Sequence, residues 1–232
     1  MRRVLGYISK VFRFAMVQEL ADRDPTVGVG DAIEKRVESH FAAITEPDEV
    51  AILLRAIYGY GGHPVTCAAL KLAPMLFQRP HMLRKAEWSE LRLDAAEWRI
   101  PAEKMKMKSD HIVPLPTQAV EILRALRPIS GHGRYVFPSH RPERPMSENT
   151  INAALRTLGY DGDKMVGHGF RAMTRTILDE VLGERVDVIE HQLAHAVKDV
   201  NGQAYNRTTH LAARRDMMQR WADYLDRIRN AS

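Results

Sequence analysis

The sequence predicts an α+β fold that is mainly α-helical and contains one small three-stranded antiparallel sheet. In most of the chain, apolar residues recur at three- and four-residue spacing, which is the period of an amphipathic helix. Between residues 88 and 115 this period gives way to short apolar runs separated by polar turns, which indicates strands. With 232 residues, 45% of them hydrophobic and 27% charged, the chain has the composition of a globular protein.

The first expected element is an amphipathic helix over residues 1–22, which Asp24-Pro25 ends. Its apolar stripe begins directly after Met1, so this helix needs a surface to cover it. Residues 25–44 mix glycines with many charged side chains. This second stretch is predicted to be a linker.

Two helices are expected next. Thr45 and Asp48 resemble a capping box, so a helix should follow to about Tyr58. A turn rich in glycine then leads to a second helix from about Pro64 to Phe77. The second helix is apolar over most of its length and should therefore be buried.

The sheet and the remaining helices complete the prediction. Three strands are expected near residues 88–93, 98–100 and 111–115. The helical period returns after Pro116, with helices expected at about 117–126, 148–158, 169–182, 186–194 and 208–229. Ser147 is expected to cap the second of these helices, and Gly159 to end it.

Composition excludes several classes of protein. The single cysteine, Cys67, rules out a disulfide framework and a four-cysteine zinc site. The longest uncharged stretch, residues 56–70, contains glycine and proline and is too short to cross a membrane. The net charge of +5 favours nucleic acid only slightly over other partners. We expect a protein of the cytoplasm or nucleoid with no membrane partner.

Few motifs carry chemistry on their own. The sequence has no phosphate-binding glycine loop, no serine-hydrolase motif and no metal-binding motif, so no cofactor is expected. His168-Gly-Phe-Arg171 places two basic side chains on one face at the start of an expected helix. Taken alone this pattern carries little weight, because His81-Met-Leu-Arg84 matches it as well.

Other basic and aromatic residues also have ordinary explanations when taken singly. Lys104, Lys106 and Lys108 alternate with methionines, so a strand would place the three ammonium groups on one face. Such a strand is either a solvated edge or a basic hairpin on a nucleic-acid groove. Arg79 could be a solvated arginine at a helix end, and His195 could interact with a helix dipole. Tyr205 could be a packing residue.

The order of these residues along the chain is more informative than any one of them. Taken in sequence, the set resembles the catalytic residues of the tyrosine recombinases, the phage integrase family: Arg79, Lys106, His168, Arg171, His195 and Tyr205. Arg79-Pro-His-Met-Leu-Arg84 is similar to the family's Arg-x-x-Glu-Leu-Arg element, and Leu193-Ala-His195 stands where Leu-Gly-His is usual. Tyr205 follows His195 by ten residues, close to the usual spacing.

The resemblance covers about residues 40–229. Within it, residues 145–150 and 188–195 look like the integrases of prophages and genomic islands that insert at tRNA genes. The resemblance implies the catalytic fold of DNA breaking-rejoining enzymes over residues 45–232. Residues 1–24 would then be a remnant helix of a core-binding domain, and residues 25–44 the linker.

The implied reaction is site-specific recombination through a 3′-phosphotyrosine, without metal or ATP. Tyr205 would attack phosphorus, and removing the phenol proton at neutral pH costs roughly 4 kcal/mol. His168 is the candidate base, and Lys106 would protonate the leaving 5′-oxygen. Guanidinium groups clamp phosphate bidentately, which suits Arg79 and Arg171, and His195 would hydrogen-bond a phosphate oxygen.

The expected partners are double-stranded DNA at attachment sites and further copies of the chain in a tetramer on DNA. Five residues are expected to contact DNA: Lys104, Lys108, Asn149, Arg175 and Arg207. The C-terminal helix carries an apolar stripe formed by Leu211, Met218, Trp221, Leu225 and Ile228. This stripe either folds back on its own domain or docks into a neighbouring protomer.

Two departures from the family lead to an alternative. Met82 stands where the family has the glutamate that braces the scaffold of the active site. Residues 1–22 correspond only to the last core-binding helix, so a truncated gene or a fragment is expected. The alternative function is a truncated, catalytically impaired DNA-binding remnant. A type IB topoisomerase and a helical regulator without a phosphate site are further alternatives.

Overall fold

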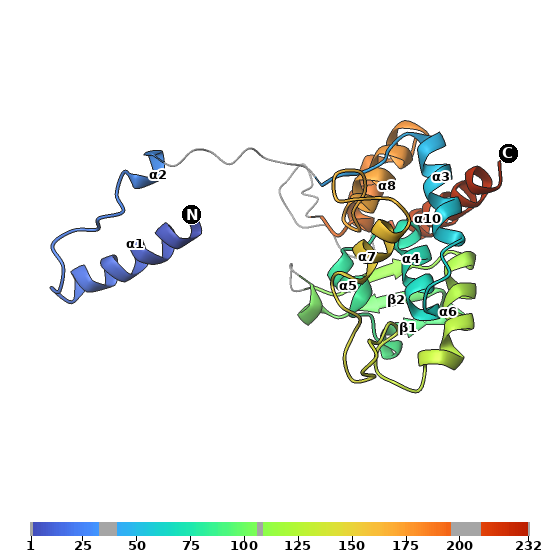
Figure 1. Cartoon of the computed structure of the whole chain (residues 1–232), viewed down its shortest axis with the longest axis horizontal. Helices are drawn as coiled ribbons and strands as arrows, with labels where there is room; N and C mark the ends of the chain where they lie inside the picture. The colour runs from blue at the N-terminus through green and yellow to red at the C-terminus, as the bar shows by residue number, and fades with distance from the viewer. Residues whose placement is uncertain (1, 33–40, 106–108, 196–209, 232) are drawn as a thin grey trace. The chain divides into compact units, whose positions relative to one another are not determined.

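Figure 1 shows a computed structural model of the chain, which describes residues 2–32, 41–105, 109–195 and 210–231. The chain forms two compact units, residues 1–40 and 41–232. In the first unit, helix α1 spans Arg2–Val17 and the short helix α2 spans Val29–Ala32. The first helix therefore ends before residue 22, because the chain turns at Glu19, which has a left-handed φ of 56°.

The second unit has the predicted α+β architecture. Its helices are α3 (Pro47–Tyr58), α4 (Pro64–Leu76), α5 (Pro80–Arg84), α6 (Thr117–Ser130), α7 (Thr150–Thr157), α8 (Gly169–Glu180), α9 (Val186–Gln192) and α10 (Leu211–Asn230). Its strands are β1 (Leu91–Arg92), β2 (Glu97–Ile100) and β3 (His111–Pro114). Short 3-10 turns lie at Trp88–Glu90, Leu93–Ala95 and Ala102–Lys104.

Two predicted helix caps are wrong. Helix α3 begins at Pro47 with Glu46 as N-cap and no side-chain cap, so the capping box of Thr45 and Asp48 does not form. Proline suits the first turn of a helix, where an N–H has no intrahelical partner, and it sets the start one step later. Ser147 Oγ accepts the N–H of Asn149 at 3.3 Å instead of capping α7 itself, which starts at Thr150.

The sheet confirms the prediction of three antiparallel strands. Strands β1, β2 and β3 pair in that order, and both pairs are antiparallel. Trp98 of β2 lies opposite Val113 of β3, and both side chains are buried. Trp98 Nε1 donates to Glu90 Oε2 at 2.9 Å, so the buried indole has a partner for its N–H.

The prediction of a strand at the lysine–methionine alternation is wrong at its first residue. Lys104 ends a 3-10 turn, Ala102–Lys104, that leads away from β2. Pro101 precedes this turn, and proline cannot donate to a strand ladder, which accounts for the break. Residues 106–108, which include Lys106 and Lys108, lie outside the described residues.

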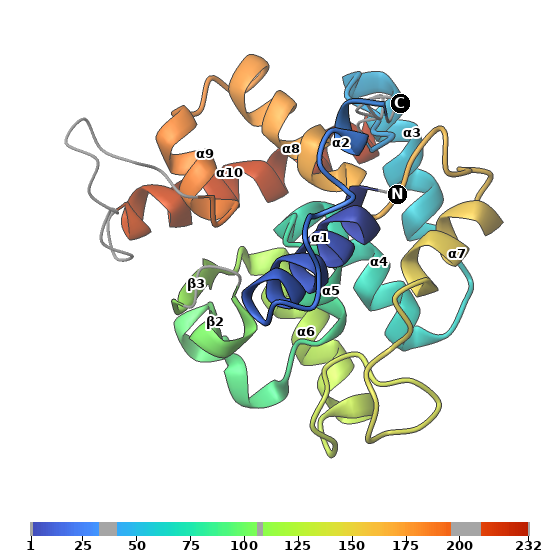
Figure 2. The same cartoon turned by 90° about the vertical axis from the view of Figure 1, so that its left-hand side faces the viewer.

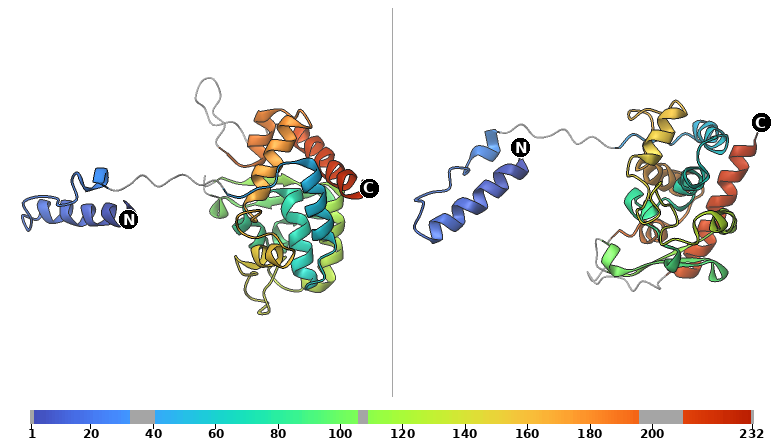
Figure 3. Two further views of the ribbon diagram at one scale, coloured as in Figure 1. Left: turned by 45° about the horizontal axis from the view of Figure 1, so that its top comes forward. Right: turned by 60° about the horizontal axis from the view of Figure 1, so that its bottom comes forward.

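Helices α3, α4 and α6 lie side by side (Figure 3), and α10 packs against α3 and α4. The middle of the apolar stripe of α10 is buried in this core, with Trp221 fully covered beside Met218 and Leu225, whereas Leu211 and Ile228 are partly exposed. Trp221 Nε1 donates to the carbonyl oxygen of Pro74 at 3.0 Å, and its ring meets Phe77 edge-on with centroids 6.5 Å apart. Of the two expectations for this stripe, the structure therefore has it folded on its own unit.

Figure 2 shows α8, α9 and α10 together on one side of the second unit. The described helices include none that combines the length and the apolar character needed to cross a bilayer. Three helix ends meet in this unit: the end of α4, the start of α8 and the end of α9. Hydrogen bonds from Arg171 to Phe77 and Leu193 join these three places.

Candidate phosphate-binding site

Arg79 is presented by a strained connection between α4 and α5. Phe77, the C-cap of α4, is fully buried and has a left-handed φ of 40°, which costs an L-residue roughly 1 kcal/mol or more. Arg79 is the N-cap of α5, and its carbonyl oxygen accepts from the N–H groups of Met82 and Leu83. Its guanidinium is half-buried and makes no hydrogen bond or ion pair with a residue that the structure describes.

Arg171 is a second, more deeply buried cation. It lies in the first turn of α8 and is 6% exposed. Its guanidinium donates to the carbonyl oxygens of Phe77 at 3.0 Å and Leu193 at 2.9 Å. Burial and the neighbouring Arg79 lower the pKa of Arg171 to about 10, so the group stays protonated at neutral pH. Two cations that act on each other electrostatically, with no carboxylate of the described residues bonded to either one, are suited to bind an anion.

Two histidines flank these cations. His168 is the N-cap residue of α8, and the ring of Phe41 lies over its ring with centroids 4.2 Å apart. Burial lowers the pKa of His168 most, and the positive charges of Arg171 and Arg79 lower it further. The pKa of His81 is lowered in the same way, mostly by burial and next by the charge of Arg79. Both shifts favour the neutral form of the ring, in which one nitrogen can accept a proton.

His195 follows α9 and contacts both Arg171 and Glu190. Its Nε2 lies 3.0 Å from Nη2 of Arg171, and its Nδ1 lies 2.5 Å from Oε2 of Glu190. The other oxygen of Glu190 accepts from Nε of Arg175 at 3.0 Å. Arg175, which the sequence assigned to DNA contact, is also 3.6 Å from Asp179, so in this structure it pairs with two carboxylates.

A buried polar network fixes the surroundings of Arg79. The backbone oxygen of Gln192 accepts from Nε2 of Gln78 at 3.0 Å and lies 3.3 Å from Nε2 of His111. The side-chain oxygen of Gln192 accepts from Nε and Nη2 of Arg214 at 3.0 and 2.7 Å. This network joins the residue next to Arg79 to β3, to the end of α9 and to the start of α10.

Burial shifts the pKa of both basic members of this network. It lowers the pKa of Arg214 to about 10 and, together with Arg214, the pKa of His111 to about 3. Neither residue, nor Gln192, was predicted from the sequence. Arg214 stands beside Arg215 in a polar stretch that has the pattern of a solvated helix face, so the sequence carries no signal of its burial.

The remaining predicted contacts are spread more widely. Lys104 forms ion pairs with Glu90 and with Glu87, at 2.6 Å for the latter, and donates to the backbone oxygen of Lys85 at 3.1 Å. Burial opposes the charge of Lys104, but the hydrogen bonds with Glu87 and Glu90 outweigh it and raise its pKa. Asn149 is exposed at the start of α7. Lys106, Lys108, Tyr205 and Arg207 lie outside the described residues.

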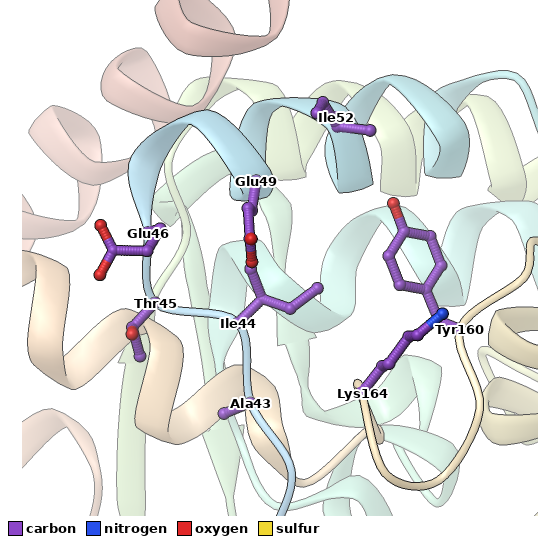
Figure 4. A pocket seen from close by; sticks show the side chains of 8 residues that line it. All are labelled: Ala43, Ile44, Thr45, Glu46, Glu49, Ile52, Tyr160 and Lys164. Atoms are coloured by element: carbon purple, nitrogen blue, oxygen red, sulfur yellow. The ribbon is translucent and has the colours of Figure 1, made fainter.

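A separate hollow of about 460 Å³ lies between residues 43–52 and the loop after α7. Figure 4 shows Tyr160 and Lys164 on one side of it and the residues of the other segment facing them. Its lining carries two glutamates and one lysine, so it lacks the positive charge that a phosphate needs. Among the described residues, no group of three or more histidine, cysteine or carboxylate side chains is arranged to hold a metal ion.

Comparison with known proteins shows the family of this chain. Residues 44–211 match the phage integrase family. The chain belongs to the phage integrase family. It is 38% identical to the integrase of Enterobacteria phage P4 over 99% of its own length, and 38% identical to the prophage integrase IntA of Escherichia coli K12 over 96%. The chain spans about half of these relatives, 55% and 53% of their lengths.

Solved structures show the same fold. A lambda integrase dimer bound to a COC′ core site matches 88% of the chain with a TM-score of 0.61 at 18% identity, over 60% of that protein. The integrase of mycobacterium phage Brujita matches 97% of the chain with a TM-score of 0.60 at 17% identity, over 75% of that protein. The predicted family and fold class are therefore confirmed.

Against the family pattern, the residue at position 82 has an apolar role here. Met82 is 5% exposed and belongs to the hydrophobic core of the second unit. A thioether gives Arg79 no strong hydrogen bond, so the backbone turn at the start of α5 and the Gln78–Gln192 contact hold this arginine in place. His81, two residues after Arg79, is the basic neighbour that the sequence analysis left aside.

Proposed function

We propose that this chain is the catalytic part of a tyrosine-type site-specific DNA recombinase. The observation that carries the proposal is the guanidinium of Arg79, without a partner among the described residues, beside the buried Arg171 in a chain of the phage integrase family. Two adjacent guanidiniums match the non-bridging oxygens of a phosphodiester and stabilise the charge that develops on them during displacement.

In the proposed reaction, Tyr205 forms the new bond to phosphorus while the bond to the 5′-oxygen breaks. The product is a 3′-phosphotyrosine and a free 5′-hydroxyl, and the reverse displacement rejoins the strand. Deprotonating the phenol costs roughly 4 kcal/mol at pH 7, which the neutral ring of His168 and the nearby cations would offset. Lys106 would give its proton to the leaving 5′-oxygen, and His195 would bind a phosphate oxygen.

The proposed partner is double-stranded DNA at attachment sites, met in the cytoplasm at the nucleoid, and the proposed working form is a tetramer. Lambda integrase has been solved as a dimer bound to a core site and as a tetramer bound to a Holliday junction. We also propose that the C-terminal helix links protomers. Because Met218, Trp221 and Leu225 of the apolar stripe of α10 are buried in their own unit, that contact would use other residues of the helix.

A covalent-capture experiment tests the proposal even though the target site is unidentified. The full chain is incubated with a pool of nicked suicide duplexes that are randomised around the nick, and adducts that survive SDS are recovered and sequenced. We expect wild-type adducts that converge on one core sequence and none from Tyr205→Phe. Adducts that persist in Tyr205→Phe would place the nucleophile elsewhere.

The same experiment addresses the alternative of a catalytically impaired DNA-binding remnant, for which the apolar Met82 is the motivating observation. A remnant would bind the duplexes through electrostatic contacts and form no SDS-stable adduct. Met82→Glu would then be the variant to examine, because it returns the family's carboxylate to this position.

A further inference from the structure

The two ring nitrogens of His195 face partners of fixed and opposite hydrogen-bonding type. Nε2 lies 3.0 Å from a guanidinium nitrogen of Arg171, and Nδ1 lies 2.5 Å from a carboxylate oxygen of Glu190. A guanidinium can only donate, and an ionised carboxylate can only accept. A neutral ring satisfies both partners in one way only, with its proton on Nδ1 and its lone pair on Nε2.

Glu190 is ionised in this setting. Burial works to raise its pKa, but the hydrogen bonds from His195 and Arg175 outweigh that effect and hold the pKa below its usual range. Arg175 donates to Oε1 at 3.0 Å and thereby fixes the orientation of the carboxylate, leaving Oε2 for His195. The carboxylate therefore joins α9 both to Arg175 of α8 and to the turn that carries His195.

His195 needs such a support. Its side chain is 45% exposed, and the preceding residue, Ala194, has a left-handed φ of 52°, so the ring stands at a turn and not within a helix. Without Glu190, only Arg171 would hold the ring among the described residues. The orientation of His195 thus depends on a residue of α9 that does not itself reach the guanidinium of Arg171.

We propose that Glu190 is a positioning residue that fixes His195 in the Nδ1–H form and directs its Nε2 toward Arg171, into the phosphate-binding site. The consequence for catalysis rests on the proposed function. For His195 to donate to a phosphate oxygen, Nε2 must take up a proton from solvent. Glu190 then faces the opposite side of the imidazolium and stabilises its charge.

Replacing one oxygen of Glu190 by nitrogen gives a sharp test. In Glu190→Gln, Arg175 is a donor and retains the amide oxygen, so the amide NH₂ faces Nδ1 of His195. The ring must then accept at Nδ1 and carry its proton on Nε2, where it opposes the N–H of Arg171. An isosteric change thus inverts the tautomer, as amide replacement does at the aspartate of a serine-protease triad.

The tautomer is measured without DNA. Nitrogen-15 NMR of the full chain at neutral pH reports the ring nitrogens, and the His195 signals are assigned by their loss in His195→Gln. We expect the Nδ1–H form in the wild type and the Nε2–H form in Glu190→Gln. An Nε2–H ring in the wild type, or an unchanged ring in Glu190→Gln, would overturn the inference.

Rates of adduct formation on the captured core sequence supply the second readout. We expect both Glu190→Gln and Glu190→Ala to slow adduct formation by about 10- to 100-fold, by analogy with the loss seen when carboxylates that orient metal-bound histidines are removed. The matched control is Asp179→Asn, which alters the other carboxylate near Arg175 and leaves Glu190 intact. It should change neither the tautomer nor the rate, and a rate loss equal to that of Glu190→Gln would contradict the assignment.

The two readouts separate this inference from the proposed function. If the wild type forms no adduct while its His195 ring is Nδ1–H, the proposed function fails and the positioning role of Glu190 stands. If the wild type forms adducts with an Nε2–H ring, only the inference fails. Urea unfolding of each variant, followed by tryptophan fluorescence, checks that the ring is measured in folded protein.

Discussion

Replacing Gly169 with alanine should separate the start of α8 from the segment that precedes α3. Gly169 lies between His168 and Arg171, and a Cβ atom there would stand 2.1 Å from the carbonyl oxygen of Ala42 and 3.2 Å from Cα of Ala43. Real Cβ atoms essentially never come within 3.0 Å, so the two backbones must move apart by about 1 Å. No side-chain rotation can relieve this contact, because Cβ is fixed by the backbone of residue 169 and its neighbour is a backbone oxygen.

The structure sets the scale of the effect. Overpacking of this kind costs about 1–3 kcal/mol of unfolding free energy. The separation would also loosen the 3.4 Å hydrogen bond from Val166 N–H to the carbonyl oxygen of Ala42 and the tilted ring contact between Phe41 and His168. Because a shift of about 1 Å in a catalytic group can cost about 100-fold in rate, adduct formation should fall by about that factor.

Urea unfolding followed by tryptophan fluorescence measures the loss of stability. All three tryptophans, Trp88, Trp98 and Trp221, belong to the second unit, so the signal reports that unit alone. The midpoint should fall by roughly 0.5–1 M urea. Gly162→Ala is the control, since a Cβ atom there meets nothing within 4 Å. A Gly169→Ala midpoint equal to that of Gly162→Ala would refute the reasoning.

Three further predictions follow from other residues. Lys106→Ala should slow cleavage of a normal strand strongly and be rescued by a 5′-bridging sulfur, whose departure needs no proton; equal loss on both substrates would reduce Lys106 to a DNA contact. Burial, and to a smaller extent Arg214, lowers the pKa of His111 from 6.5 to about 3. Below pH 6.5 the imidazole is therefore protonated in the unfolded state while it stays neutral in the folded state. The unfolding free energy should therefore fall by roughly 2 kcal/mol from pH 7 to pH 5, and His111→Gln should remove that part of the slope in urea titrations. Lys104→Met should cost about 1–3 kcal/mol, because it leaves the buried Glu90 without its cation, while Glu87 keeps Arg134. Arg124→Met, in the exposed pair with Asp94, should stay within about 0.5 kcal/mol of the wild type in the same assay.

Much of the fold could be predicted because it follows from local periodicity. Trp98 and Ile100 are two residues apart in β2 and both buried, and α10 has an apolar stripe at helical spacing. Caps were less predictable. Thr45 and Ser147 both have suitable side chains, but proline at position 47 and the turn at Asn149 move the helix starts past them. A cap depends on one residue of backbone register, which the apolar period does not define.

The residues of the site also fall into a group that could be predicted from the sequence and a group that could not. The order of Arg79, His168, Arg171 and His195 along the chain was enough to predict the family, because each follows a recognisable boundary of a local element. The partners of these residues come from tertiary structure. Gln192 and Arg214 look like ordinary polar residues in the sequence, and only the folded chain joins Gln192 to Gln78, the neighbour of Arg79, and Arg214 to Gln192. Glu190 reaches His195 across a single turn, but the sequence pattern does not show that its carboxylate faces the ring.

The tertiary structure also decided which charges remain available. Lys104 and Arg175 have the sequence pattern of DNA contacts, and both are paired with carboxylates in the folded chain. Arg79 has the sequence pattern of any helix-end arginine, and its guanidinium has no partner among the described residues. The physical reason is that periodicity and capping act over a few residues, whereas an ion pair depends on which distant groups folding places within about 4 Å of each other.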